Sequence, residues 1–195
     1  MLYVWVVLAS YLIGSIPFSY LIALYWKGID IRKTGSGNVG MTNVWRNAGP
    51  VAGVIALTGD LGKGALAIML ARYYGDPLLV ALSGMAVLAG HSWPLFLGFK
   101  GGKLVATGVG VLVAISPPVG ALVAIIWLAA VGITKYVSVA SILAVSSIPF
   151  LMLAFHLERP YLAAGLFITF FAVYKHIPNI KRLLAGTEPK IKRRF

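Results

Sequence analysis

Residues 104–133 read LVATGVGVLVAISPPVGALVAIIWLAAVGI, a stretch without a single charged side chain. A helix needs about 20 mostly apolar residues to cross the ~30 Å hydrocarbon layer of a bilayer. The stretch is therefore either one long span kinked at Pro117-Pro118, or two short spans, Leu104–Ser116 and Pro118–Ile133. The choice decides how often the chain crosses the membrane and on which side it ends.

Apolar runs of the same kind fill the rest of the chain: Leu2–Trp26, Pro50–Arg72, Pro77–Phe99, Tyr136–Phe155 and Pro160–Tyr174. Of all residues, 59% are hydrophobic and only 11% are charged, too few to cover the surface of a soluble domain of this size. The first run has no Lys or Arg before it and no small-residue cleavage site after it, so we expect a retained span. The sequence predicts an all-α integral membrane protein, with residues 1–195 as a single domain.

The basic residues indicate the topology, because Lys and Arg next to spans favour the cytoplasmic side. If residues 104–133 form two spans, one side collects the following basic residues: Lys27, Arg32, Lys33, Arg46, Lys100, Lys103, Lys135, Lys175, Lys181, Arg182, Lys190, Lys192, Arg193 and Arg194. The opposite loops keep only Arg72 and Arg159, each near an acidic residue. If they form one span, the basic tail lies opposite the basic first loop. We therefore predict a bundle of seven transmembrane helices, with the N-terminus outside and the C-terminus in the cytoplasm.

The first of the two short spans also predicts a pocket. At ~1.5 Å per residue, Leu104–Ser116 is about 20 Å long, shorter than the hydrocarbon layer. The preceding loop, Lys100–Lys103, is then expected below the membrane surface. Non-helical backbone is tolerated there only beside protein or a wet cavity, so we expect a pocket on the cytoplasmic side.

A glycine-rich segment, TGSGNVGMTN over residues 34–43, lies in the first predicted cytoplasmic loop and is followed by Arg46. Its GxGxxG spacing is not a dinucleotide site, because such sites need a preceding strand and membrane spans flank this one. Glycines let backbone amides approach an anion, polar side chains add hydrogen bonds, and an arginine can clamp phosphate. The alternative is a flexible polar loop. The candidate ligand-binding residues here are Gly35, Ser36, Gly37, Asn38, Gly40, Thr42, Asn43 and Arg46.

Two charges lie inside the second apolar run, in the sequence GDLGKG over residues 59–64. Asp60 and Lys63 are three residues apart and therefore share a helical face. Charges inside a span are costly and usually are paired or face a cavity. They form either a structural ion pair or a site in which Lys63 faces a substrate anion and Asp60 orients it. Gly64 is expected to allow close packing or close ligand approach.

A third segment places Lys100 and Lys103 on either side of Gly101-Gly102, just before a predicted helix that contains Thr107. Free amides and a partial positive charge make a helix N-terminus a natural phosphate site. It is not a P-loop, because Leu97 and Leu104 stand where Gly and Ser or Thr are needed. The alternative is that both lysines only anchor the topology. His91, earlier in this segment, is by itself more typical of a hydrogen-bonded packing residue than of a base.

His176 and Asn179 leave the last span three residues apart, so both can reach back toward the same pocket. The alternative for this basic segment is a lipid-headgroup anchor.

With these segments on one side, the sequence resembles the PlsY family of bacterial membrane acyltransferases. The matching stretches are Gly14–Pro17, Gly35–Asn43 with Arg46, Asp60–Gly64, Gly90–Pro94, Phe99–Lys103, Val105–Thr107 and Asn179–Glu188. They are spread over essentially the whole chain. One departure is Leu104, where the family commonly has Gly after the second lysine.

The resemblance implies a seven-span enzyme of the bacterial inner membrane with a cytoplasmic active site, acting in phospholipid biosynthesis. It would move a fatty acyl group from acyl-phosphate to glycerol 3-phosphate, giving 1-acylglycerol 3-phosphate (lysophosphatidic acid) and phosphate. The candidate catalytic residues are Ser36, Arg46, Lys103, His176 and Asn179. The candidate substrate-binding residues are Gly35, Gly37, Asn38, Gly40, Thr42, Asn43, Asp60, Lys63, Gly64, His91, Lys100, Gly101, Gly102 and Thr107.

Both implied substrates carry phosphate, so we expect two anion subsites shared among Arg46, Lys63, Lys100 and Lys103. The H-x-x-x-x-D arrangement of soluble-donor acyltransferases is absent. Asp60, His91 and His176 remain candidate bases, but we prefer the donor's own phosphate, which already lies beside the reacting carbonyl. An acyl-enzyme on Ser36 has less support, since no Ser-His-Asp spacing accompanies it.

The net charge of +12 is assigned to topology and anion binding rather than to nucleic acid. The absence of cysteine excludes disulfides and a thiol nucleophile, and no pattern suggests a metal or another cofactor. Acyl-phosphate, glycerol 3-phosphate and membrane lipid are the expected partners, and the oligomeric state is left open. A transporter or channel for a phosphorylated solute is the rival function, because buried charges around a wet pocket also suit it.

Overall fold

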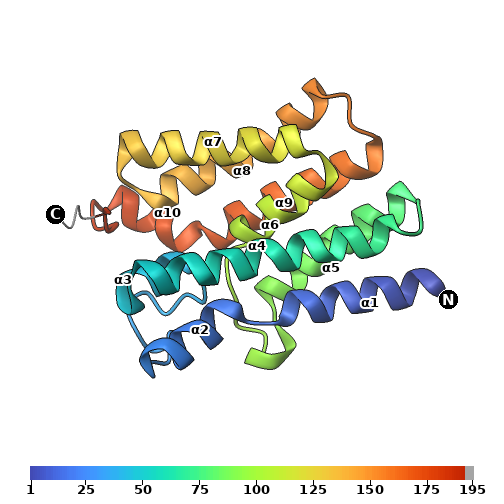
Figure 1. Cartoon of the computed structure of the whole chain (residues 1–195). Helices are drawn as coiled ribbons and strands as arrows, with labels where there is room; N and C mark the ends of the chain where they lie inside the picture. The colour runs from blue at the N-terminus through green and yellow to red at the C-terminus, as the bar shows by residue number, and fades with distance from the viewer. Residues whose placement is uncertain (192–195) are drawn as a thin grey trace.

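The computed structural model describes residues 1–191, and all regular elements in this range are helices (Figure 1). They are α1 (Leu2–Ser15), α2 (Phe18–Lys27), α3 (Met41–Ala48), α4 (Pro50–Arg72), α5 (Pro77–Ser92), the 3₁₀ helix η1 (Leu95–Leu97), α6 (Val105–Ile115), α7 (Pro117–Thr134), α8 (Val137–Ala154), α9 (Arg159–Lys175) and α10 (Ile177–Leu184). Three residues of the predicted basic tail, Lys192, Arg193 and Arg194, lie outside the described residues.

Five stretches of the described chain are helical, long and apolar enough to cross a membrane: Leu2–Lys27, Pro50–Arg72, Pro77–Leu97, Pro117–Thr134 and Val137–Ala154. A sixth is the α9–α10 pair, if its 50° bend lies within one span. The apolar helix α6 is shorter, at 11 residues. The stretch 104–133 is thus two helices that meet at Ser116, as the two-span interpretation requires.

Two of the predicted apolar runs are candidate spans as expected, but each contains a break in the helix at a proline. The first run breaks at Ile16-Pro17, between α1 and α2, because proline has no N–H to continue the helical ladder. The third run leaves α5 at Ser92, and Pro94 leads into η1. The first break leaves the Ile16 carbonyl available to other donors.

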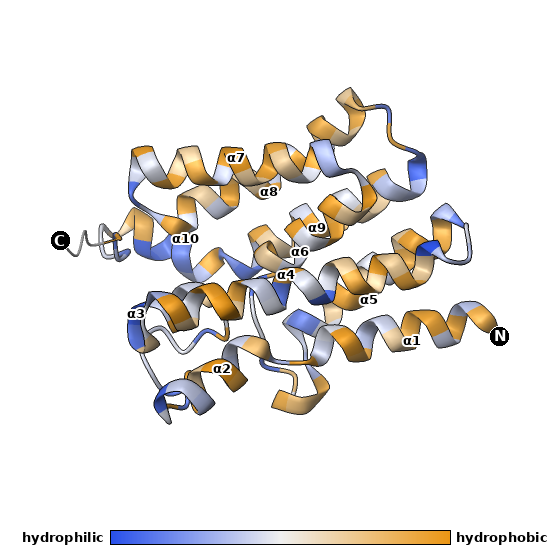
Figure 2. Cartoon of the chain, viewed as in Figure 1, coloured by the Kyte–Doolittle hydropathy of each residue, from blue (hydrophilic) through white to orange (hydrophobic). Residues whose placement is uncertain are grey.

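The helices lie side by side in a bundle in which α1 packs on α5, α4 on α6, and α7 on α8. Figure 1 shows α3, α10 and the end of the described chain together at one end of the bundle, and the N-terminus at the other. Figure 2 shows hydrophobic residues along the helices and hydrophilic ones gathered mainly at α3, α10 and the loops. The basic first loop and the α10 segment therefore share one end, as predicted.

Glycines bring α4 and α6 into close contact. A Cβ atom at Gly64 would lie 2.3 Å from the Thr107 carbonyl oxygen, and one at Gly110 would lie 2.0 Å from that of Leu61. Of the two expectations for Gly64, close packing and close ligand approach, the structure therefore favours close packing. At the far end of α6, Arg72 Nη1 donates a 2.6 Å hydrogen bond to the Ala114 carbonyl, which supplies a partner at the end of this short helix.

Candidate active site

A cavity of about 680 Å³ opens among these helices, within the usual size range of small-molecule sites. Its walls come from the segment before α3, from α3 itself, from α4, α6, α7 and α8, and from the C-terminal segment. The predicted residues that line it are Gly35, Ser36, Asn38, Gly40, Thr42, Asn43, Arg46, Asp60, His91, Lys103, His176 and Asn179. All five candidate catalytic residues thus meet at one cavity.

The glycine-rich segment is folded around the side chain of Asn43, which is buried. Asn43 Nδ2 donates to the carbonyls of Ile31, Thr34 and Asn38 at 3.0–3.1 Å, and its Oδ1 accepts from the Ser36 amide at 3.2 Å. These hydrogen bonds favour a structured segment over the alternative of a flexible loop. Asn43 acts as its scaffold, while the Ser36 hydroxyl accepts only a long 3.4 Å bond from the Asn38 amide and can donate to a ligand.

Lys103 and Asn179 join across the cavity. Lys103 Nζ donates to Asn179 Oδ1, and Asn179 Nδ2 donates to Glu188 Oε1 at 2.7 Å. Arg182 Nε donates to the other Glu188 oxygen, also at 2.7 Å. Arg46 Nη2, on α3, donates to the Pro189 carbonyl at 3.2 Å. These bonds hold the C-terminal segment against α3 and α10 as part of the cavity wall.

This end of the cavity carries excess positive charge. Burial, and to a lesser extent the nearby positive charge of Arg182, lowers the pKa of Lys103 to about 8. Burial also lowers the pKa of Arg46, with a contribution from Arg182. Glu188 is the one acidic side chain among the lining residues at this end within residues 1–191. An incoming anion would relieve this repulsion, which favours a phosphate site.

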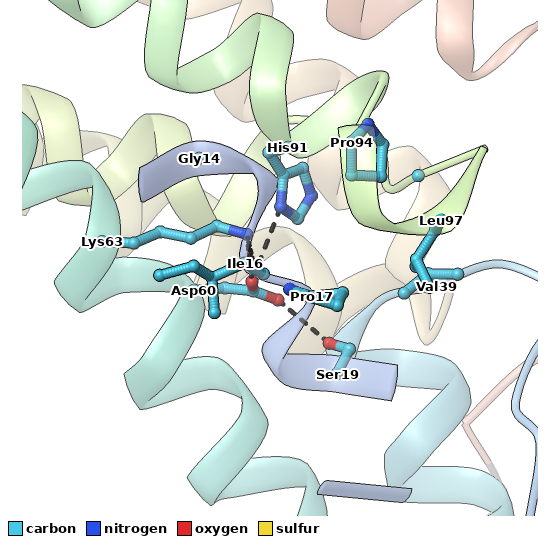
Figure 3. A pocket seen from close by; sticks show the side chains of 11 residues that line it. Gly14, Ile16, Pro17, Ser19, Val39, Asp60, Lys63, His91, Pro94 and Leu97 are labelled. Carbon is cyan, nitrogen blue, oxygen red and sulfur yellow. Dashed lines mark hydrogen bonds and ion pairs between the residues drawn. The ribbon is translucent and has the colours of Figure 1, made fainter. Parts of the chain in front are cut away.

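Asp60 and Lys63 form a buried ion pair beside the break between α1 and α2 (Figure 3). Lys63 Nζ lies 2.9 Å from Asp60 Oδ1 and donates to the Ile16 carbonyl at 2.9 Å. Asp60 Oδ2 accepts from Ser19 Oγ at 2.9 Å, and His91 Nδ1 lies 3.5 Å from Oδ1. The shared helical face of Asp60 and Lys63 is confirmed, and their partners favour the structural ion pair over a Lys63 that faces substrate. Lys63 lines only a small space of about 10 Å³ next to the cavity.

The loop before α6 differs from the prediction. The Gly101 amide donates to the Ser92 carbonyl at 3.2 Å and the Gly102 amide to the His91 carbonyl at 3.0 Å, so neither is free for an anion. Lys100 is exposed and does not line the cavity. Of this loop, only Lys103 reaches it.

The remaining expectations concern Gly37, Thr107 and Leu104. Gly37 and Thr107 are absent from its lining, and Thr107 is fully buried. Gly37, Lys63, Lys100, Gly101, Gly102 and Thr107 do not line this cavity, so the geometry gives no support to their prediction as substrate-binding residues. Leu104 has a left-handed backbone (φ +72°) and a fully buried side chain. Glycine adopts that conformation without strain, which accounts for its frequent use at this position.

His176 Nδ1 lies 2.7 Å from the Ala172 carbonyl oxygen. Because a carbonyl only accepts, Nδ1 carries the hydrogen, and Nε2 of the neutral ring is left as an acceptor. His176 lines the cavity, and its Nε2 is therefore a hydrogen-bond acceptor among the lining residues.

Away from the cations the cavity continues as an apolar arm, which sequence reasoning missed. Its walls are Leu57 and Leu61 on α4, Val105, Ala106 and Val109 on α6, and Ala124, Trp127 and Leu128 on α7. Trp127 Nε1 donates to Ser141 Oγ at 3.1 Å, which fixes the indole. Arg182, Glu188, Ser138 and Ser141 are also lining residues that were not predicted as such. For these four polar residues, the only available signal in the sequence was a polar side chain in or beside an apolar run. Within residues 1–191, no three His, Asp or Glu side chains gather where a metal ion could bind.

Comparisons with known proteins agree with this geometry. Residues 4–186 match the family model described as "Glycerol-3-phosphate acyltransferase". Proteins of that name from Desulforamulus reducens and Desulforudis audaxviator are each 49% identical to this chain. The first alignment covers 96% of this chain and 94% of the relative, and the second covers 93% and 91%.

A crystal structure of PlsY, an integral membrane glycerol 3-phosphate acyltransferase, in its glycerol 3-phosphate form superposes with a TM-score of 0.95 at 37% identity. The lysophosphatidic acid form gives 0.93 at 36%. Each match covers 98% of this chain and 96% of the other. Fold and comparisons together define an integral membrane acyltransferase. More narrowly, the chain belongs to the glycerol-3-phosphate acyltransferase family, which favours the enzyme over the rival transporter.

Proposed function

We propose that this protein transfers a fatty acyl group from acyl-phosphate to glycerol 3-phosphate, giving lysophosphatidic acid and phosphate for phospholipid synthesis. The observation that carries the proposal is the two-part cavity, in which a cation-rich end continues into an apolar arm. The cationic end suits the phosphates of both substrates, and the arm suits a fatty chain.

Arg46 and Lys103 both line the cationic end of the cavity, which supports a role for each in holding a substrate phosphate. Ser36 and Asn179 would hydrogen-bond the bound molecules, with Gly35, Asn38, Gly40 and Thr42 shaping the loop side. Positive side chains that face the departing phosphate would stabilise its charge in the transition state.

In the reaction, a glycerol 3-phosphate hydroxyl oxygen attacks the acyl carbonyl carbon, and the bond from that carbon to the phosphate oxygen breaks. The hydroxyl proton passes to the departing phosphate, whose oxygen lies beside the reacting carbonyl. Asp60 is a poor base, since Lys63 and Ser19 already engage its two oxygens. His176 is the competing base, through Nε2.

The pattern of basic loops supports a seven-span topology in which α6 is the short span, the N-terminus is outside, and the active site faces the cytoplasm of a bacterial inner membrane. The loop that carries Lys103 would then lie below the membrane surface, beside the cavity. Residues 1–195 would form one domain.

Purified protein in detergent tests the reaction. Phosphate release from acyl-phosphate should require glycerol 3-phosphate and should produce lysophosphatidic acid in equal amount. Release without the acceptor, or use of a different donor only, would refute the proposed reaction. For the base, His176→Ala should retain a measurable chemical step in single turnover. Its complete loss with substrate binding intact would assign the proton to His176.

A further inference from the structure

His91 links the buried charges to the loop that carries Lys103. Its Nδ1 faces Asp60 Oδ1 at 3.5 Å, and its carbonyl accepts the Gly102 amide at 3.0 Å. The His91 side chain is thus oriented by Asp60 on α4, while the His91 backbone carbonyl holds the loop at Gly102.

The His91 ring also lies directly against Gly102. A Cβ atom at Gly102 would lie 2.1 Å from His91 Nε2. On the other side, Ser92 Oγ donates to the Gly102 carbonyl at 3.1 Å, and the Gly101 amide is tied to the Ser92 carbonyl. Gly102 therefore cannot shift unless the ring moves with it.

Lys103 follows Gly102 directly and sends its ammonium group across the cavity to Asn179. Its backbone precedes α6 and is not held by a helical ladder, so its position depends on the 101–102 pairing. The His91 ring itself is buried between Asp60 and Gly102, which is a packed and oriented position rather than the free position that a base needs.

We propose that His91 is a positioning residue: held by Asp60, it sets the place of Gly102 and so aims Lys103 at the phosphate of a bound substrate. The proposal rests on the proposed function, in which Lys103 contacts that phosphate. It assigns the ring no proton transfer.

The first test compares two replacements of His91. An asparagine amide can replace Nδ1–H toward Asp60, but neither asparagine nor leucine can act as a base. His91→Leu should lower kcat/KM for glycerol 3-phosphate about 10–100-fold, the usual cost of losing an orienting partner. His91→Asn should recover at least about tenfold of that loss. His156→Asn, the same change at an exposed histidine, should leave the rate unchanged. If Asn is as inactive as Leu, the contact with Asp60 does not account for the loss and the proposal is overturned.

The second test is a double-mutant cycle with Lys103. In a Lys103→Ala background, His91→Leu should change kcat/KM by less than about twofold, because its effect passes through Lys103. If His91→Leu lowers kcat/KM equally with Lys103 and with Ala at position 103, the positioning role of His91 is overturned and the proposed function is not affected. A fully active Lys103→Ala would instead refute the phosphate contact in the proposed function.

Rates are normalised to folded protein measured by size-exclusion chromatography, and His91→Ser replaces the leucine variant if that variant does not fold. A loss that disappears on normalisation would mean that His91 only stabilises the fold, which also overturns the proposal.

Discussion

Breaking the Asp60–Lys63 pair should destabilise the protein far more than removing both charges. The two charged atoms are 2.9 Å apart, and both side chains are 2% exposed. At an effective dielectric constant of ~20, their attraction is about 6 kcal/mol before desolvation is subtracted. Removing one partner leaves the other as an uncompensated buried charge, which typically costs about 3–5 kcal/mol.

We therefore expect Asp60→Asn and Lys63→Met each to lower the free energy of unfolding by about 3–5 kcal/mol, and the double variant to recover most of it. The measurement is reversible unfolding in mixed micelles by SDS titration, followed by tryptophan fluorescence. Asp30→Asn is the matched control, since it breaks an exposed pair with Arg32 at 2.8 Å and should have little effect.

Additive losses, with a coupling below about 0.5 kcal/mol, would refute the reasoning. The stable double variant also separates the two interpretations of Lys63. If Lys63 only neutralises Asp60, the double variant keeps most of its activity. A stable double variant with a greatly raised KM for glycerol 3-phosphate would show that the pair contributes to substrate binding, either through Lys63 or through the contact of Asp60 with His91.

Further predictions concern pH, helix packing and backbone strain. Because the pKa of Lys103 is about 8, its positive charge is present below that pH, and kcat/KM for glycerol 3-phosphate should fall as pH rises through 8. Lys103→Arg should move this fall to higher pH, with rates measured against an enzyme-free blank. Gly64→Ala should destabilise the protein by about 1–3 kcal/mol, because the added methyl group pushes α4 away from α6. Gly62→Ala, which has open space at its Cβ, should be neutral or slightly stabilising. Equal melting temperatures of the two variants would contradict the close contact between α4 and α6. Both Leu104→Gly and Leu104→Ala empty a buried site. The glycine variant should be more stable than the alanine variant by about 1–2 kcal/mol, because only alanine retains the strain of the left-handed backbone. The reverse order of stability in thermal unfolding would refute this account of the strain.

Hydropathy and charge were enough to locate the apolar helices and to predict that the polar segments share one side, whereas the choice of candidate catalytic residues depended on the family resemblance. The division of residues 104–133 followed from the basic loops, since no local signal in the stretch distinguishes a kink from a turn. Ser36, Lys103 and Asn179 meet because each follows or precedes a span on the same predicted side.

The remaining features depend on contacts between distant segments. The direction of the Lys63 side chain depends on the Ile16 carbonyl, which only the break at Pro17 makes available. The amides of Gly101 and Gly102 are taken by carbonyls at the end of α5, which no sequence spacing specified. The apolar arm has no signature of its own, because its residues look like any other residues of a span.

The apolar arm reaches Leu128, which is 63% exposed on the outside of the bundle. A chain bound there would stay in contact with bilayer lipid from arrival to departure. Moving a long acyl chain into water costs about 0.8 kcal/mol per methylene, on the order of 10 kcal/mol in all. An enzyme whose cavity opens laterally to the hydrocarbon layer of the bilayer avoids that cost, so that only the headgroups change their surroundings during turnover.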